Sequence, residues 1–395
     1  MTASRPPCWR GWRGRASRCA SCRCRVIRWT ATVTEPTRLR ILADDLTGAL
    51  DSAAAFATPR APIPVLWRAA PGLPAIAAID AGTRELGAAS AVSRQDGFAD
   101  WLLGGAPAFK KIDSLLRGNW AEEVAALSAR AAGWRVVVAP AFPFHGRVTR
   151  GGRQWTLDAG EPLGGDIAAV LREVGFSAVA ALRVHDAESD ADLDRVVAQE
   201  TSCGGAVLWV GTGGLAAALA RSRPAWATGV GAPVASRHVS APLLAFIGSH
   251  HPVTRAQIGR AVADDPGRHI RLSANPGDID AVLERLARGL SCLVTVAFEG
   301  ARADAARVIA ERFARLLARC PPPGTLFVAG GETLRDVAVA IGAEGLAVEG
   351  AREPGLAVSR LRGGRFDGVR VLSKSGAFGA PDLLRGLVDA ASSAS

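Results

Sequence analysis

The chain has 395 residues, of which 49% are hydrophobic, so it exceeds one typical domain and has enough apolar residues for two buried cores. No run of 18 apolar residues is free of charged side chains, so a membrane-spanning helix is not expected. The net charge of +10 comes largely from residues 1–34, which hold eight Arg and no acidic residue. The remainder carries about +2, a balance that argues against a nucleic-acid-binding surface.

Residues 1–34 differ in composition from the rest of the chain and hold four of its seven Cys. The spacing Cys19-x-x-Cys22-x-Cys24 has no second pair of Cys or His to complete a zinc site. The segment also lacks the apolar stretch of a signal peptide. We expect it to be disordered, or to precede a true translation start near Val33. The remaining cysteines are typical of free thiols in a reducing cytoplasm: Cys203, Cys292 and Cys320.

Beyond this segment, short apolar runs alternate with Gly- or Asp-containing turns and Ala-rich helical stretches. A strand at 39–43, an exit loop and a helix at 49–57 give the first example. The pattern predicts an α/β fold of two doubly wound domains with largely parallel sheets. Residues 228–242 are rich in Gly, Pro and Ser and form the best linker, so the predicted domains are 35–235 and 236–395.

The sequence "LADDLTGAL" places two carboxylates where the first strand ends and a helix begins. Ligands of parallel α/β sheets bind at the carboxyl ends of the strands. One carboxylate, Asp44 or Asp45, could therefore accept a proton from a substrate hydroxyl while the other holds magnesium or the loop. The alternative is that Asp45 or Thr47 simply caps the helix.

The sequence "KKIDSLLRGN" contains two of only three lysines in a chain that otherwise uses arginine. Lysine is a flexible point charge that arginine does not replace freely. Together with the Asp, Ser, Arg and Asn that follow, it could bind the carboxylate and hydroxyls of a small polar acid. The alternative is a surface charge cluster in which Ser114 or Asn119 caps the next helix.

Two later loops are suited to phosphate. "LFVAGGETLRD" is a strand, a glycine pair and a helix start, and glycines there let backbone N–H groups approach an anion at a helix N-terminus. "VLSKSGAFG" repeats the arrangement with Lys374, the third lysine. The chain has neither a G-x-x-x-x-G-K-[ST] P-loop nor a G-x-G-x-x-G dinucleotide motif.

"FIGSHHPVTRAQI" places Ser249, His250 and His251 between a strand and a helix. Adjacent histidines rarely bind one metal ion together, and no third ligand is evident, so we expect no metal site here. We instead predict that this loop contacts a nucleotide. His145 stands in another strand-exit loop and is a candidate for supporting the site from behind the contact residues.

Seven motifs occur in the order found in the four-carbon acid sugar kinases, which the chain resembles over about residues 38–390. They are "ILADDLTGALD", "TRE", "KKIDSLLRGN", "APAFPFHGR", "GSHHPVTRAQI", "GGETL" and "KSGAFG". The resemblance implies an N-terminal domain that binds the sugar acid, a C-terminal domain that binds ATP, and catalysis in the cleft between them.

Matched to the motifs, the expected substrate contacts are Asp44, Asp45, Arg84, Lys110, Lys111, Ile112, Asp113, Ser114 and Arg117. The expected nucleotide contacts are Ser249, Gly330, Gly331, Glu332, Thr333, Lys374, Gly376 and Gly379. For catalysis we expect Asp45 to be the general base, with Asp113 second, and Lys111 to neutralise the substrate carboxylate. No protein residue is assigned to a metal; Mg²⁺ is expected with the nucleotide phosphates.

The expected activity is ATP-dependent phosphorylation of the terminal hydroxyl of threonate, erythronate or 3-oxo-tetronate. A non-catalytic sugar-acid or nucleotide sensor and an ATP-dependent carboxylate-activating ligase are the alternatives. The expected partners are a small sugar acid and ATP, with neither nucleic acid nor membrane. A cytoplasmic location is expected, and a homo-oligomer stays open.

Overall fold

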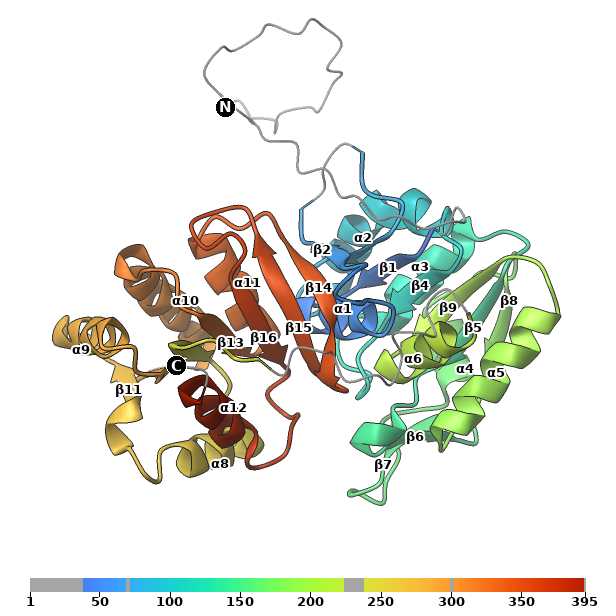
Figure 1. Cartoon of the computed structure of the whole chain (residues 1–395). Helices are drawn as coiled ribbons and strands as arrows, with labels where there is room; N and C mark the ends of the chain where they lie inside the picture. Colours follow the sequence, from blue (N-terminus) through green and yellow to red (C-terminus); the bar gives the residue numbers. More distant parts are fainter. Residues whose placement is uncertain (1–37, 69–71, 224–237, 299–301, 394–395) are drawn as a thin grey trace, which may run out of the picture. The chain divides into compact units, whose positions relative to one another are not determined.

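A 14-stranded sheet runs through the chain in the computed structural model, which describes residues 38–68, 72–223, 238–298 and 302–393 (Figure 1). We call residues 38–223 the N-terminal lobe and residues 238–393 the C-terminal lobe. Seven neighbouring strands belong to the N-terminal lobe and are mutually parallel. In spatial order they are β2 (Ile63–Leu66), β3 (Ala77–Asp80), β1 (Arg40–Ala43), β4 (Ala108–Lys111), β9 (Val207–Gly211), β5 (Arg135–Ala139) and β8 (Ala181–Val184).

The other seven strands belong to the C-terminal lobe, and five of them are parallel. The parallel strands are β11 (His269–Leu272), β12 (Cys292–Val296), β10 (Leu243–Ile247), β13 (Thr325–Ala329) and β16 (Arg370–Lys374). Next come the antiparallel β15 (Leu356–Arg362) and β14 (Gly345–Glu353), and β14 pairs antiparallel with β2. This last pairing joins the two lobes into one sheet.

Each lobe has a point where the strand order reverses. In the N-terminal lobe the chain leaves β1 toward β3 on one side and returns to β4 on the other; in the C-terminal lobe β12 and β13 flank β10 in the same way. The helices that follow these strands lie against the sheet (Figure 1). Loops diverge at such points and leave a crevice outside the strand ends. The motif loops after β1, β4, β10 and β13 therefore lie where ligands of doubly wound sheets bind.

Helices cover both faces of the sheet, as the alternating pattern predicted. In the N-terminal lobe they are α1 (Leu46–Ala54), α2 (Ala88–Leu103), α3 (Trp120–Arg130), the 3₁₀ turn η1 (Pro143–His145), α4 (Ile167–Glu173), α5 (Asp190–Ser202) and α6 (Gly213–Arg221). In the C-terminal lobe they are α8 (Pro252–Ala261), η2 (Pro266–Arg268), α9 (Gly277–Ala287), α10 (Arg302–Arg319), α11 (Gly331–Ala340) and α12 (Leu383–Ser392). A two-stranded hairpin, β6 (Arg147–Arg150) and β7 (Arg153–Thr156), completes the N-terminal lobe.

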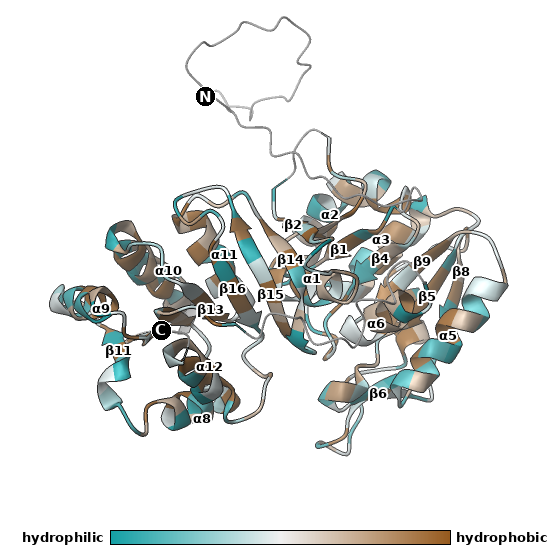
Figure 2. Cartoon of the chain, viewed as in Figure 1, coloured by the Kyte–Doolittle hydropathy of each residue, from teal (hydrophilic) through white to brown (hydrophobic). Residues whose placement is uncertain are grey.

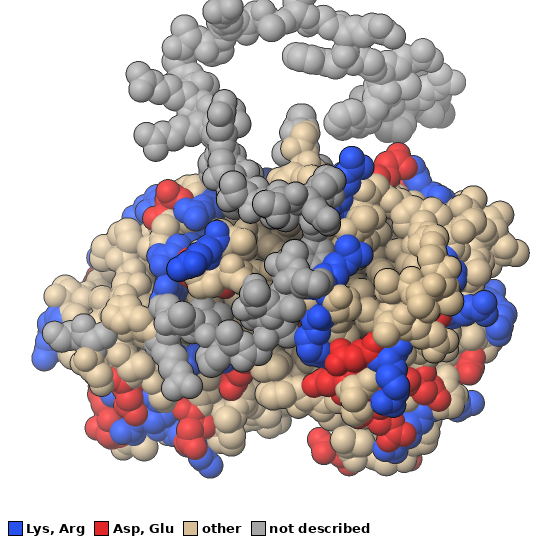
Figure 3. Space-filling view, turned by 45° about the vertical axis from the view of Figure 1, so that its right-hand side comes forward, with Lys and Arg blue, Asp and Glu red and all other residues tan. Residues whose placement is uncertain are grey.

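The apolar residues concentrate on the strands and on the inward faces of the helices (Figure 2). One core cluster continues from the N-terminal lobe into the C-terminal lobe through the paired strands β2 and β14, where Val65 and Leu346 are fully buried. On the face shown in Figure 3, positive and negative side chains are interspersed. Across the described ranges, no helix combines the length and apolarity needed to span a bilayer.

The predicted α/β fold class and two-lobe arrangement are confirmed, and both limits of the first helix are corrected. This helix spans Leu46–Ala54 rather than 49–57, and it begins earlier because Asp45 caps it. The expectations for residues 1–34 and for most of the 228–242 linker fall outside the described residues. The domain limits 35–235 and 236–395 therefore stay predictions.

Candidate active site

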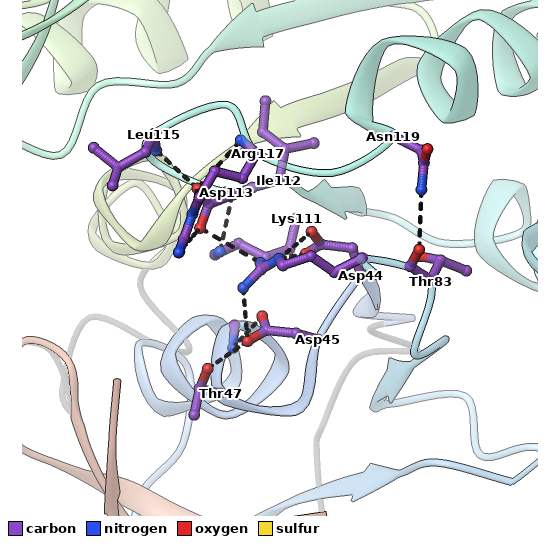
Figure 4. A network of polar contacts seen from close by, with 12 residues as sticks. Asp44, Asp45, Thr47, Thr83, Lys111, Ile112, Asp113, Leu115, Arg117 and Asn119 are labelled. Carbon is purple, nitrogen blue, oxygen red and sulfur yellow. Dashed lines mark hydrogen bonds and ion pairs between the residues drawn. The ribbon is translucent and has the colours of Figure 1, made fainter. Parts of the chain in front are cut away.

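Three loops of the N-terminal lobe are tied together by Arg84, which follows β3. Its Nε and Nη2 donate to the two oxygens of Asp44 at 2.8 Å each, and its Nη1 lies 2.9 Å from Oδ2 of Asp45. Nη2 also lies 3.6 Å from Oδ1 of Asp113 in the loop after β4 (Figure 4). Burial acts against the charge of Arg84, but the three carboxylates outweigh it and raise its pKa. The guanidinium is thus fixed, charged, at the meeting point of the motif loops.

Asp45 is the N-cap of α1. Its Oδ1 accepts the backbone N–H of Gly48 at 2.9 Å, and its Oδ2 accepts the Thr47 hydroxyl at 2.5 Å beside Arg84. Burial alone would raise the pKa of Asp45, but the charges of Arg84 and Lys111 and these hydrogen bonds lower it. Both oxygens therefore already have protein partners. Asp45 therefore caps α1, as the alternative interpretation of the motif predicted, and its role as general base stays a prediction.

The two adjacent lysines lie on opposite faces of β4, because successive side chains of a strand alternate. Lys110 is fully buried and its Nζ lies 2.7 Å from Oε2 of Glu123 on α3. Lys111 points to the other face, where its Nζ donates to the carbonyl of Ile112 at 2.9 Å. Among the described residues, no carboxylate lies within ion-pair distance of Lys111. Lys111 therefore lines the central cavity without a carboxylate partner of its own.

The loop after β4 is organised around Asp113. Its carboxylate receives two hydrogen bonds of 2.8 Å from the Arg117 guanidinium and further ones from the backbone N–H groups of Leu115 and Arg117. Burial alone would raise the pKa of Asp113, but the Arg117 bonds and the charge of Arg84 hold it well below its usual range. Asn119 donates to the carbonyls of Thr83 and Leu86, which fastens the loop rather than presenting a donor to a ligand.

In the C-terminal lobe, the loops after β10 and β16 meet at Gly376. A Cβ at this glycine would lie 2.0 Å from Oγ and 2.9 Å from Cβ of Ser249, so a larger residue would force the two loops apart or displace the Ser249 side chain. Lys374 is almost fully buried and donates to the Thr254 hydroxyl and to backbone carbonyls of its own loop. Burial lowers its pKa to about 8. The result is a backbone-lined pocket with one buried cation, as an anionic ligand requires.

The motif loops of the two lobes border the same cavity, which has a volume of about 250 Å³. From the N-terminal lobe it is lined by Asp45, Thr47, Asp51, Arg84, Lys111, Asp113, Ser114 and Arg117; from the C-terminal lobe, by Ser249, His251, Gly355, Lys374, Ser375, Gly376 and Phe378. A second cavity of about 480 Å³ adjoins it and shares Asp45, Arg84 and Arg117 with it. Gly331 and Glu332, at the start of α11, line this second cavity.

Comparison with known proteins supports the arrangement. The family described as "Sugar-binding N-terminal domain" matches residues 39–169, and "Nucleotide-binding C-terminal domain" matches residues 244–384. A protein of Cupriavidus necator named D-threonate kinase is 31% identical over 87% of this chain and 95% of its own length. The chain belongs to the four-carbon acid sugar kinase family. It is thus a phosphotransferase with a nucleotide-binding C-terminal lobe.

One further relative and one solved structure are similar to this chain. A D-threonate kinase of Bordetella bronchiseptica is 28% identical over 87% of this chain and 95% of its own length. The crystal structure of Haemophilus influenzae protein HI1011 matches with a TM-score of 0.63 and 18% identity, covering 88% of this chain and 99% of that one. At that identity the match shows the fold alone, and the fold is the same.

Not every predicted contact of this kinase reaches the cleft. Lys110 on β4 and Ile112 just after it are fully buried, and Lys110 pairs with Glu123, so both are assigned to the protein core rather than to substrate. Gly330, Thr333 and Gly379 border neither cavity. Gly330 precedes α11 with a φ of +113°, and Gly379 accepts a hydrogen bond from Gln257, so these shape the loops.

Residues that the sequence did not single out also line the central cavity: Asp51, Phe142, Arg147, Gly355 and Phe378. Asp51 had a usable signal, since it lies four residues after Thr47 on the same helix and so on the same face. Gly355 and Phe378 come from turns whose approach to the N-terminal lobe depends on the β2–β14 pairing. His145 stacks on Phe378 at a ring-centroid distance of 3.6 Å and so supports the cleft from behind.

Mg²⁺ has no preformed protein cage in the described part of the chain, where no group of three or more acidic, His or Cys side chains is arranged to hold a metal. The carboxylates of Asp44, Asp45 and Asp113 are engaged by Arg84 and Arg117. Mg²⁺ commonly keeps its waters and binds through substrate phosphates and one or two carboxylates. The residues therefore fit an ion that arrives with a nucleotide rather than a resident one.

Proposed function

We propose that the chain transfers the γ-phosphoryl group of ATP to the terminal hydroxyl of threonate, erythronate or 3-oxo-tetronate. One observation carries the proposal: a single cavity is lined both by the loops after β1 and β4 and by the loops after β10 and β16. Phosphoryl transfer depends mainly on in-line positioning and on cations that stabilise the transferred group. Both requirements can be met where these loops face one another.

The sugar acid is assigned to the N-terminal side of this cavity. Lys111 offers an ammonium group with no carboxylate partner, and Arg117 is partly exposed at the rim. The Ser114 side chain lines the same wall and offers a neutral hydroxyl. These groups suit one carboxylate and several hydroxyls. Arg84 contributes its positive charge, although its main contacts are with the three carboxylates of the protein.

The nucleotide is assigned to the C-terminal side. Lys374, Ser249 and the backbone around Gly376 line the central cavity, and the start of α11 lines the neighbouring one. Backbone N–H groups at helix starts and a buried lysine favour phosphate. Mg²⁺ would arrive with ATP and would neutralise part of the phosphate charge.

Two relatives are named D-threonate kinases, so threonate is the first acid to test. The experiment is an ADP-release assay across threonate, erythronate and 3-oxo-tetronate, followed by ³¹P NMR of the products. A kinase gives ADP and a stable phosphomonoester. An acyl-phosphate or an adenylate would instead indicate a carboxylate-activating ligase, and binding of acid and ATP without turnover would indicate a sensor. Either result would overturn the proposal.

A further inference from the structure

Asp51 is an acidic residue of the central cavity that none of the motif-based assignments uses. It lies on α1, one turn beyond the DDLTG stretch, and is half-buried. Its Oδ1 accepts the backbone N–H of Gly355 at 3.0 Å, and Gly355 lies in the turn between β14 and β15 of the other lobe. Asp51 therefore lies where the two halves of the cavity meet.

The second oxygen of Asp51 is held close to the start of α6. A Cβ at Gly213 would lie 2.1 Å from Oδ2, so glycine at this position makes room for the carboxylate. Oδ2 has no hydrogen-bond donor among the described residues. The first turn of a helix favours a negative charge beside it. One oxygen of Asp51, a residue that lines the central cavity, is thus anchored, while the other has no hydrogen-bond partner among the described residues.

This geometry differs from that of Asp45, the carboxylate first expected to be the base. Asp45 uses one oxygen for the Gly48 N–H and the other for Thr47 and Arg84. A proton acceptor needs a free lone pair that faces its donor. The Asp45 carboxylate has three protein partners and the Asp51 carboxylate has one, so Asp51 keeps more of its acceptor sites free.

The charges around Asp51 support the contrast. Burial raises the pKa of Asp51, and Asp45 adds to this, while Lys111 and the Gly355 N–H oppose it. His145 lies beside Gly355, and burial lowers its pKa to about 4, so it is neutral in the working pH range. The groups that α6 and the β14–β15 turn present to Asp51 are backbone. The other charged or titratable side chains of the cavity are Arg84, Asp113, Arg117, Arg147, His251 and Lys374.

We propose that Asp51 is the general base of the phosphoryl transfer; this rests on the kinase function proposed above. The hydroxyl O–H bond of the sugar acid breaks and its proton passes to the Asp51 carboxylate. The alkoxide oxygen forms the new bond to the γ-phosphorus as the bond to the β-phosphate oxygen of ATP breaks, and ADP leaves. The proton passes to solvent when the product is released, which restores the carboxylate.

Asp51 also has a structural role through Gly355, and the Asp51→Asn substitution separates the two roles. The Asn side-chain carbonyl can still accept the Gly355 N–H, while the amide can no longer take a proton. Asp51→Ala removes both functions. The matched control is Asp100→Asn, since Asp100 lies exposed on α2 and borders neither cavity.

The test is kcat and KM by ADP release from pH 5 to pH 10, with thermal melting to verify folding. Asp51→Asn should lower kcat by about 10²–10⁴-fold and leave both KM values within about threefold. Wild-type kcat should fall as the pH drops and the base becomes protonated; this acid limb should vanish in Asp51→Asn and persist in Asp45→Asn and Asp100→Asn. If Asp51 had only a structural role, the acid limb of the kcat–pH profile would be the same in Asp51→Asn as in the wild type.

Wild-type kcat in a folded Asp51→Asn protein would overturn the inference and leave the kinase function standing. An acid limb that vanishes in Asp45→Asn and persists in Asp51→Asn would also overturn it, because the base would then be Asp45. If the wild-type protein released ADP with none of the acids, the proposed function would fail, and the role of Asp51 with it.

Discussion

The buried pair of Lys110 and Glu123 gives the sharpest prediction about the adjacent lysines. Lys110 and Glu123 are fully buried, and the Nζ–Oε2 distance is 2.7 Å. Neither Glu123 carboxylate oxygen has another hydrogen-bond partner in the described part of the chain. Lys110→Met therefore leaves a buried carboxylate without a counter-charge.

Removing one partner of such a pair costs about 3–5 kcal/mol of unfolding free energy. For 395 residues the unfolding entropy is about 0.8 kcal/mol/K, so the Tm should fall by about 4–6 °C. The double variant Lys110→Met/Glu123→Leu removes both charges and should recover to within about 1 kcal/mol of the wild type, or exceed it. Urea titration of the four proteins of the cycle at pH 8 measures these values.

Lys111→Met is the matched control on the neighbouring position. It should change the Tm little, because Lys111 has no carboxylate partner, but should raise KM for the sugar acid by at least about tenfold, the worth of a 1.4 kcal/mol contact. Lys110→Met should keep wild-type kcat and KM in its folded fraction. Unchanged stability together with lost turnover in Lys110→Met would refute the separation of the two lysines.

Three further predictions concern the cleft. Gly376→Ala forces a Cβ against Ser249 and should weaken nucleotide binding by at least about tenfold in calorimetry. The control Gly386→Ala, whose added Cβ meets no neighbour within 4 Å, should leave the affinity unchanged. Equal affinities of the two variants would contradict the close packing of the loop at Gly376. Because burial lowers the pKa of Lys374 to about 8, its ammonium is present below that pH and lost above it, so nucleotide affinity should fall between pH 7.5 and 9.5. The Lys374→Met variant should bind the nucleotide weakly, with an affinity nearly independent of pH over this window. A wild-type affinity that rises with pH there would contradict the role of Lys374. Arg84→Lys cannot reproduce the forked contacts to three carboxylates and should lower both kcat/KM and Tm; wild-type values of both would refute the organising role of Arg84.

The sequence was sufficient for those parts of the fold and site that depend on local pattern. Apolar runs ending in Gly or Asp predicted the positions of the strands in the sequence. The motifs at the carboxyl ends of these strands predicted which loops line the cleft. The pairing of β14 with β2 had no local signal, because it joins strands about 280 residues apart in the sequence. That pairing brings Gly355 to Asp51, which explains why the sequence did not connect them.

Two predictions were wrong although the sequence held the information to correct them. Treating both lysines of β4 as substrate contacts ignored the alternation of side chains in a strand, which sends Lys110 toward Glu123. Starting the first helix at residue 49 rather than at Leu46 left Thr47 outside the helix and hid that Asp51 shares a helical face with it. In both cases the side-chain chemistry was predicted correctly, but the face of the strand or helix on which the side chain lies was not.

The most direct test of the shared cleft is a crystal structure with a non-hydrolysable ATP analogue and threonate bound together. We expect the acid against Lys111 and the triphosphate against Ser249 and Gly376, with the terminal phosphate and the acid's terminal hydroxyl facing one another in the central cavity. Binding of the two ligands in cavities that do not communicate, or of the acid on the far side of β4 beside Lys110, would contradict it.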